Sequence, residues 1–131
     1  MMSFEEYIAE VASRTLKNGG SASRPSTCIF LPVVDLWCFP KYPAKTVILP
    51  FTINLKAEIK KFISVNEIYL GESECWLGTW VNPKTGDYYL DVATGFESLA
   101  EAQKKAAQLG AKEGRKIVAL FNPKQNQTVF L

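Results

Sequence analysis

Apolar side chains recur every three or four positions near the start of the chain, which is the spacing of one face of a helix. These side chains are Phe4, Tyr7, Ile8, Val11, Ala12 and Leu16. Ser3 and Glu6 have the spacing of a capping box, and Asn18-Gly19-Gly20 supplies glycines at which a helix can end. The pattern predicts a helix over residues 3–17, followed by a small polar loop over residues 19–25.

The following segment has the residue types of strands. Residues 27–37 are rich in β-branched and aromatic side chains, but Pro32 in their middle indicates an edge strand, a bulged strand or two short strands. A turn bracketed by prolines is predicted over residues 38–44, and a strand that ends at Pro50 is predicted over residues 45–49.

A second amphipathic helix is predicted after this strand. Asn54 can cap a helix over residues 55–64, and lysines occupy the side of that helix that faces water. Its buried side is formed by Leu55, Ile59, Phe62 and Ile63. Residues 65–70 fit either the end of this helix or a strand.

Strict alternation of side chains over residues 74–92 predicts a β-hairpin, with Pro83 and Gly86 in its turn. The first strand carries Trp76, Gly78 and Trp80 on one face. The second strand carries Asp87, Tyr89 and Asp91 on the face opposite Tyr88, Leu90 and Val92.

A third helix follows the hairpin. Thr94 with Glu97 and Ser98 with Glu101 both have capping-box spacing, so the helix is predicted to start between residues 95 and 99. Its narrow apolar stripe consists of Leu99, Ala102, Ala106 and Leu109, and Gly110 or Gly114 ends it.

Two short strands are predicted at the end of the chain, over residues 116–121 and, at a sheet edge, over residues 128–131. Without the final edge strand, the predicted order of elements is α-β-β-α-β-β-α-β. This order predicts one α+β domain over residues 1–131, in which about three helices pack on an antiparallel or mixed sheet.

Composition indicates the cellular environment of this domain. The chain has 131 residues, of which 47% are apolar, as in an ordinary soluble globular protein. No apolar run approaches the roughly 18 residues of a membrane span, and the first residues lack the basic and apolar regions of a secretory signal. We therefore expect a cytoplasmic protein that does not associate with membranes.

The charge of the chain is nearly balanced, with 15 basic and 13 acidic side chains and a net charge of +2. A small basic cluster consists of Lys104, Lys105, Lys112, Arg115 and Lys116. The favoured interpretation is a solvated helix face, and a nucleic-acid-binding surface is the alternative. Nucleic-acid binding would weaken steeply with salt.

The chain contains no histidine, which removes imidazole acid–base catalysis, Ser-His and Cys-His nucleophiles and most transition-metal sites. Cys28, Cys38 and Cys75 are widely spaced, which argues against a disulfide framework and a zinc ribbon. We interpret them as small buried hydrophobic residues, with a reactive thiol as the alternative. We expect neither a metal nor a cofactor.

The hairpin and the elements after it resemble a known arrangement. The pattern Gly78-Thr-Trp-Val-Asn-Pro-Lys-Thr-Gly-Asp-Tyr-Tyr-Leu-Asp91, followed by Leu99-Ala-Glu-Ala-Gln and Lys116-Ile-Val, is similar to a hairpin–helix–strand module. This module recurs in uncharacterised bacterial proteins and in large multidomain proteins of phages and mobile elements. The resemblance covers residues 74–121, carries no catalytic residue and implies an accessory or interaction module.

Three sets of side chains are candidates for a site. Trp37, Phe39 and Tyr42, in the proline-rich turn, are expected to form an exposed aromatic patch that marks a protein interface. Trp76 and Trp80, which flank Gly78, are interpreted as core residues, with a stacking platform as the alternative. Asp87, Tyr89 and Asp91 are interpreted as a solvated outer face, with acid–base chemistry or cation binding as the alternative.

The function predicted first is that of a non-enzymatic protein-interaction or accessory module. Its partner would be another protein or a second copy of the chain, bound through residues 37–42 or an exposed sheet edge. The alternatives are a nucleic-acid-associated protein that uses the basic cluster and a histidine-free enzyme that uses Asp87, Tyr89 and Asp91. The enzyme would require a concave pocket in which these groups have shifted pKa values, whereas a flat solvated face would exclude it.

Overall fold

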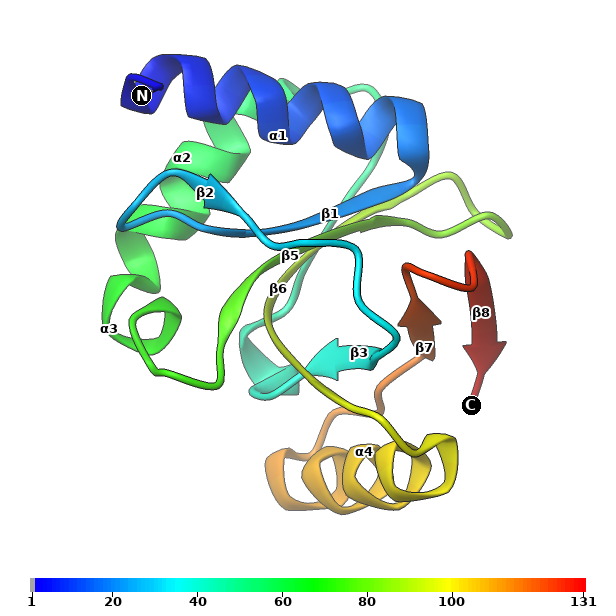
Figure 1. Ribbon diagram of the computed structural model, residues 1–131. Helices are drawn as coiled ribbons and strands as arrows, with labels where there is room; N and C mark the ends of the chain where they lie inside the picture. The colour runs from blue at the N-terminus through cyan, green and yellow to red at the C-terminus, as the bar shows by residue number, and fades with distance from the viewer. Residues whose placement is uncertain (1) are drawn as a thin grey trace.

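One strongly curled antiparallel sheet runs through the computed structural model, which describes residues 2–131, and helices cover it in two places (Figure 1). The strands of this part of the chain are β1 Gly20–Arg24, β2 Ile29–Phe30, β3 Trp37–Pro40, β4 Val47–Leu49, β5 Trp76–Val81, β6 Tyr88–Phe96, β7 Ala119–Asn122 and β8 Gln127–Phe130. The helices are α1 Phe4–Asn18, α2 Leu55–Val65, α3 Glu67–Leu70 and α4 Leu99–Glu113, with one 3-10 turn, η1 Pro43–Lys45.

The long strand β6 organises the sheet. Along the path β2-β1-β5-β6-β3-β7-β8, β5 lies on one side of β6, while β4 and then β3 pair with its other side. The pairing with β4 ends at Leu90 and that with β3 begins at Ala93, so the sheet bends between these residues. The bend brings β8 back toward β5, and the ring of Phe130 lies 6.2 Å from that of Trp80.

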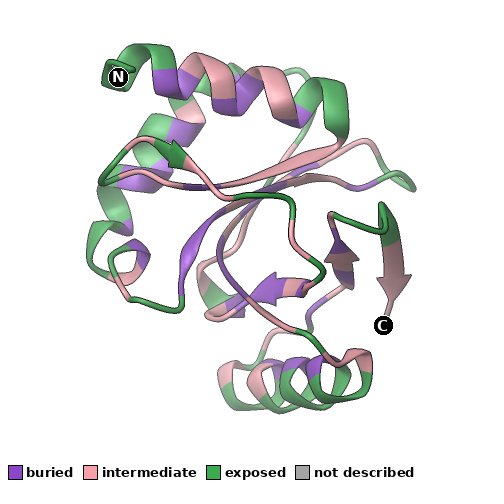
Figure 2. Ribbon diagram, viewed as in Figure 1, coloured by how far each residue is buried: buried purple, intermediate pink, exposed green. Residues whose placement is uncertain are grey.

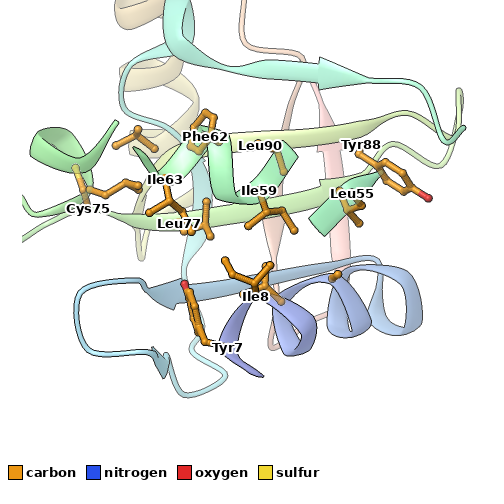
Figure 3. Close-up of a cluster of buried hydrophobic side chains, with 14 residues drawn as sticks. Tyr7, Ile8, Leu55, Ile59, Phe62, Ile63, Cys75, Leu77, Tyr88 and Leu90 are labelled. Atoms are coloured by element: carbon orange, nitrogen blue, oxygen red, sulfur yellow. The ribbon is translucent and has the colours of Figure 1, made fainter. Parts of the chain in front are cut away.

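The larger hydrophobic core lies between the sheet and the helices α1 and α2 (Figures 1 and 3). Leu77 of β5 and Leu90 and Val92 of β6 are fully buried beneath these helices, beside Tyr7 and Ile59. Burial of each such side chain stabilises the fold by about 1.5–3 kcal/mol. This core fixes the orientation of β5 and β6, and therefore which of their side chains point to the other face of the sheet.

A smaller core cluster lies under α4, away from α1 and α2 (Figures 1 and 2). It consists of Trp37, Phe39, Ala102, Ala106, Ile117 and Leu120. The alanines on the buried side of α4 let the helix approach β3 closely. Gly110 leaves room for the chain that follows α4, because a Cβ atom there would lie 3.2 Å from the carbonyl oxygen of Arg115.

The predicted α+β fold class is confirmed, and local capping signals place three of the four α-helices. Ser3 and Glu6 form the capping box of α1, Asn54 caps α2 and Ser98 caps α4. The ambiguous residues 65–70 include the short helix α3, so the described chain has one α-helix more than predicted.

Two segments predicted as irregular are strands. Residues 20–24, expected in a polar loop, form β1 and pair with Leu77 to Trp80 of β5. Residues 37–40, expected in part as a turn, form β3 between β6 and β7. Both predictions were wrong because β5, which pairs with β1, and β6, which pairs with β3, lie more than 50 residues away in the sequence. β1 also pairs with the nearby β2, but only through Ser23 and Arg24. Pro32 does mark an edge, since only Ile29–Phe30 of the preceding segment forms a strand and this strand ends the sheet.

Among residues 2–131, no helix has both the length and the apolar character needed to cross a membrane.

Candidate functional site

A cavity of about 550 Å³ lies on the concave side of the curled sheet. Its walls come from the end of α1, from β1, β3, β5, β6 and β7, and from residues 31–34. These last residues belong to the segment that joins β2 to β3, which passes in front of β5 and β6 in Figure 1. Most of the wall is apolar, and the charged side chains in it are Arg14, Lys17 and Asp91.

The floor of the cavity is made of the smallest side chains in the sheet. Gly78 of β5 is directly paired with Ala22 of β1, and Ala93 of β6 lies beside them. A Cβ atom on Gly78 would lie only 2.8 Å from the Cβ atom of Ala93, so a larger residue does not fit without movement of the sheet. At these three positions the floor therefore carries nothing larger than a methyl group.

Two tryptophans stand on either side of this floor. Trp76 and Trp80 share the face of Gly78 on β5, since side chains alternate along a strand. Trp76 is buried, with 7% of its surface exposed. Trp80 is half-buried, and its ring meets that of Tyr89 edge to face at 5.0 Å. Trp76 thus agrees with the core interpretation, and the platform interpretation of the pair stays a prediction.

Asp91 lies directly opposite Gly78, at the point where β6 changes partner from β4 to β3. The hydroxyl of Thr46 donates a hydrogen bond of 2.6 Å to the Oδ1 atom of Asp91. Arg115 is nearby, but its guanidinium donates to the carbonyl oxygen of Thr46 at 2.6 Å instead. Burial raises the pKa of Asp91 to about 6, although the hydrogen bond from Thr46 and the charge of Arg115 act in the opposite direction.

The three residues Asp87, Tyr89 and Asp91 are not brought together into one site. Asp91 lines the cavity, so the interpretation of this residue as part of a solvated outer face is wrong. Tyr89 lies beside the cavity against Trp80, and its hydroxyl accepts a hydrogen bond of 3.4 Å from Asn82. Asp87 lies in the turn before β6. Of these three residues, it is Asp91 that lines the cavity and has a shifted pKa, as the enzyme hypothesis requires.

The exposed aromatic patch expected at Trp37, Phe39 and Tyr42 is absent. Trp37 and Phe39 are 5% and 2% exposed, because alternation along β3 directs both toward α4. Tyr42 is half-buried; its ring lies 5.0 Å from that of Tyr69, and its hydroxyl donates to Glu72. The expectation of exposure was wrong because β3 was interpreted as a turn.

The basic cluster is also divided. Lys104, Lys105, Lys112 and Lys116 are exposed, as the helix-face interpretation predicts. Arg115 is half-buried and bound to Thr46, so it faces the sheet and does not join a surface of lysines.

A second group of ionisable residues lies around Lys41. The Nζ atom of Lys41 donates to Glu72 at 2.7 Å and to Glu74, and Cys75 lies beside these carboxylates. Lys41 already forms an ion pair with each of the two carboxylates, so we interpret the group as a link between the end of β3 and the start of β5. Burial raises the pKa of Cys75 to about 11 and that of Cys38 to about 12, which makes both thiols unreactive.

Some of the residues of this site were singled out from the sequence. Trp76, Gly78, Trp80 and Asp91 were all singled out, but in two separate sets. The turn over residues 82–87 places Gly78 opposite Asp91, and this register joins the two sets. Thr46 was not singled out, and Arg115 was assigned to the basic cluster, since both come near Asp91 only through tertiary structure.

Comparison of the chain with protein-family models, with curated proteins and with solved structures finds no match. The resemblance of residues 74–121 to a hairpin–helix–strand module stays a prediction. The function of the cavity therefore has to be inferred from its own residues.

Proposed function

We propose that this protein is a non-enzymatic binding module that holds an apolar, aromatic-sized ligand in the concave cavity. The observation that carries this proposal is a largely apolar cavity that is lined by the small residues Ala22, Gly78 and Ala93 together with Trp76 and Trp80. The volume of about 550 Å³ falls within the range of roughly 300–1,000 Å³ that small-ligand sites occupy.

The physical reason is that protein interiors are normally filled to crystal-like density. This cavity is not filled in that way. Its wall includes two tryptophans and its floor has no large side chains, so aromatic surface borders open space. Aromatic side chains bury large areas on contact and favour stacked or edge-to-face partners. A ligand with an aromatic or compact aliphatic body would make such contacts.

The proposal keeps the predicted binding or accessory role but moves its site to the concave face. The ligand is either a small molecule or a side chain that a partner protein inserts, since both offer the same chemistry. We place the module in the cytoplasm, which the three free thiols of Cys28, Cys38 and Cys75 favour.

A neutral fluorescent probe tests this proposal. N-phenyl-1-naphthylamine gains fluorescence when it leaves water, and we expect it to bind the protein saturably with one site. Leucine at Ala22 or Ala119 would fill the cavity from two different walls, so each variant should lose most of the binding.

The matched control is Ala100→Leu, which adds the same side chain to the exposed side of α4. This variant should bind the probe like the unmodified protein. Binding that is absent, or that survives both cavity-filling substitutions, would contradict the proposal.

A further inference from the structure

We infer that the ligand of the cavity is a protonated amine, whose ammonium group pairs with the carboxylate of Asp91 while its apolar body lies between Trp76 and Trp80. This inference rests on the proposed function and adds the charge of the ligand. Three observations support it: the state of the Asp91 carboxylate, the occupation of the nearby cations and the position of the indoles.

The Asp91 carboxylate forms few hydrogen bonds and no ion pair with the described residues. Its one hydrogen bond from the described residues comes from Thr46, and none of the ion pairs formed by these residues includes it. A carboxylate in largely apolar surroundings is costly unless a cation or several hydrogen bonds compensate it. An ammonium group in the cavity supplies both, since it is positively charged and donates hydrogen bonds.

Of the cations around Asp91, Arg14 and Arg115 have other partners, and Lys17 and Lys116 are exposed. The titratable groups that line the cavity with it, or the small space beside it, are Arg14, Lys17, Cys38, Tyr89, Arg115 and Lys116. Arg14 pairs with Glu10 at 2.9 Å and lies over the ring of Phe30 at 3.7 Å. Arg115 is bound to the carbonyl oxygen of Thr46. None of these cations forms an ion pair with Asp91 in residues 2–131.

The indoles of Trp76 and Trp80 line the same cavity as Asp91. Trp76 and Trp80 are each two residues from Gly78, which is about 7 Å along a strand. A cation is attracted to an indole face within about 6 Å of the ring centre, and tryptophan is the strongest aromatic partner. An ammonium group beside Asp91 would therefore lie in a cavity that both tryptophans line.

Three probes of the same size separate charge from shape. They are 2-phenylethylammonium, 2-phenylethanol and phenylacetate, titrated at pH 7.5 by calorimetry. We expect the ammonium to bind at least about tenfold more tightly than the alcohol, because a hydrogen bond to a charged group contributes about 1.5–3 kcal/mol. Phenylacetate should bind most weakly of the three.

Asp91→Asn should reduce the affinity for the ammonium to that for the alcohol. Asp87→Asn is the matched control, because it makes the same change in the same hairpin but outside the cavity. A measurement on the unmodified protein needs no variant: affinity for the ammonium should fall as the pH is lowered below about 6, where Asp91 takes up a proton. Affinity for the alcohol should stay constant over the same range.

A further arm distinguishes a small amine from the lysine of a partner protein. N-acetyl-lysine methylamide presents the same ammonium group on a peptide backbone. Tighter binding of this compound than of 2-phenylethylammonium would assign the ammonium to a protein, and weaker binding would assign it to a small molecule.

Equal affinity for the ammonium and the alcohol, or an undiminished preference in Asp91→Asn, would overturn the inference. In that case, binding of the neutral probe to the cavity would leave the proposed function standing. Failure of all the probes, charged and neutral, would remove both.

Discussion

At the scale of single residues, Asp91 is the side chain whose position most clearly lowers the stability of the folded state. Its pKa is raised from 3.8 to about 6, so the folded protein holds the proton to a higher pH than the unfolded chain does. Ionisation of Asp91 therefore destabilises the folded state as the pH rises from about 4 to about 6, and the full cost remains above that range. A residue kept at such a cost is a candidate for function.

We expect Asp91→Asn to be more stable than the unmodified protein at pH 7.5, because asparagine carries no charge to bury. The shift corresponds to a gain of up to about 3 kcal/mol, which should disappear at pH 4. Urea unfolding of both proteins at the two pH values measures this. A variant that is less stable at pH 7.5 would show that the Asp91 carboxylate is well compensated in the folded state.

At the scale of elements, sequence and structure agree wherever the signal is local. The capping residues Ser3, Asn54 and Ser98 place α1, α2 and α4, and the turn over residues 82–87 places the hairpin. What could not be predicted depends on distant partners. β1 is a polar strand made mostly of small residues, and it lies in the sheet between β5 and the short edge strand β2.

The same division explains what the sequence could reveal of the site. The alternation of Trp76, Gly78 and Trp80 follows from strand geometry, and so does their register with Asp91. Whether that face is solvated or enclosed depends on the bend of β6 and on the segment before β3. Neither leaves a pattern in neighbouring residues, so the cavity could be found only in the folded molecule.

The segment over residues 31–36 is an element whose fixation can be tested. Asp35 holds it by accepting hydrogen bonds from Asn122 at 2.7 Å and from Gln125 at 2.9 Å. We expect Asp35→Ala to speed hydrogen exchange in residues 33–36, since both bonds are lost. Exchange in α1 and α2 should stay unchanged. Asp35→Asn keeps an acceptor oxygen, so its exchange rates in residues 33–36 should lie between those of Asp35→Ala and those of the unmodified protein. Unchanged exchange in Asp35→Ala would show that apolar contacts alone hold the segment.

At the scale of the whole molecule, two hydrophobic clusters share one sheet. Leu90 and Val92 of β6 belong to the larger cluster under α1 and α2, while Ala93 to Phe96 of the same strand pair with β3. β3 in turn carries Trp37 and Phe39 of the smaller cluster. Because a continuous strand joins the clusters, separating them would break the hydrogen bonds between β6 and β3.

We therefore expect the chain to unfold as one cooperative unit, as predicted for a single domain over residues 1–131. Leu120 of the smaller cluster and Leu77 of the larger one are both fully buried, and replacing either with alanine should cost about 2–5 kcal/mol. In a cooperative molecule, Leu120→Ala also lowers the protection from hydrogen exchange of the slowest amides in β5, by the same free energy. Native-state hydrogen exchange of the two variants measures this. If the amides of β5 kept their full protection in Leu120→Ala, the part of the molecule around α4 would unfold independently of the rest.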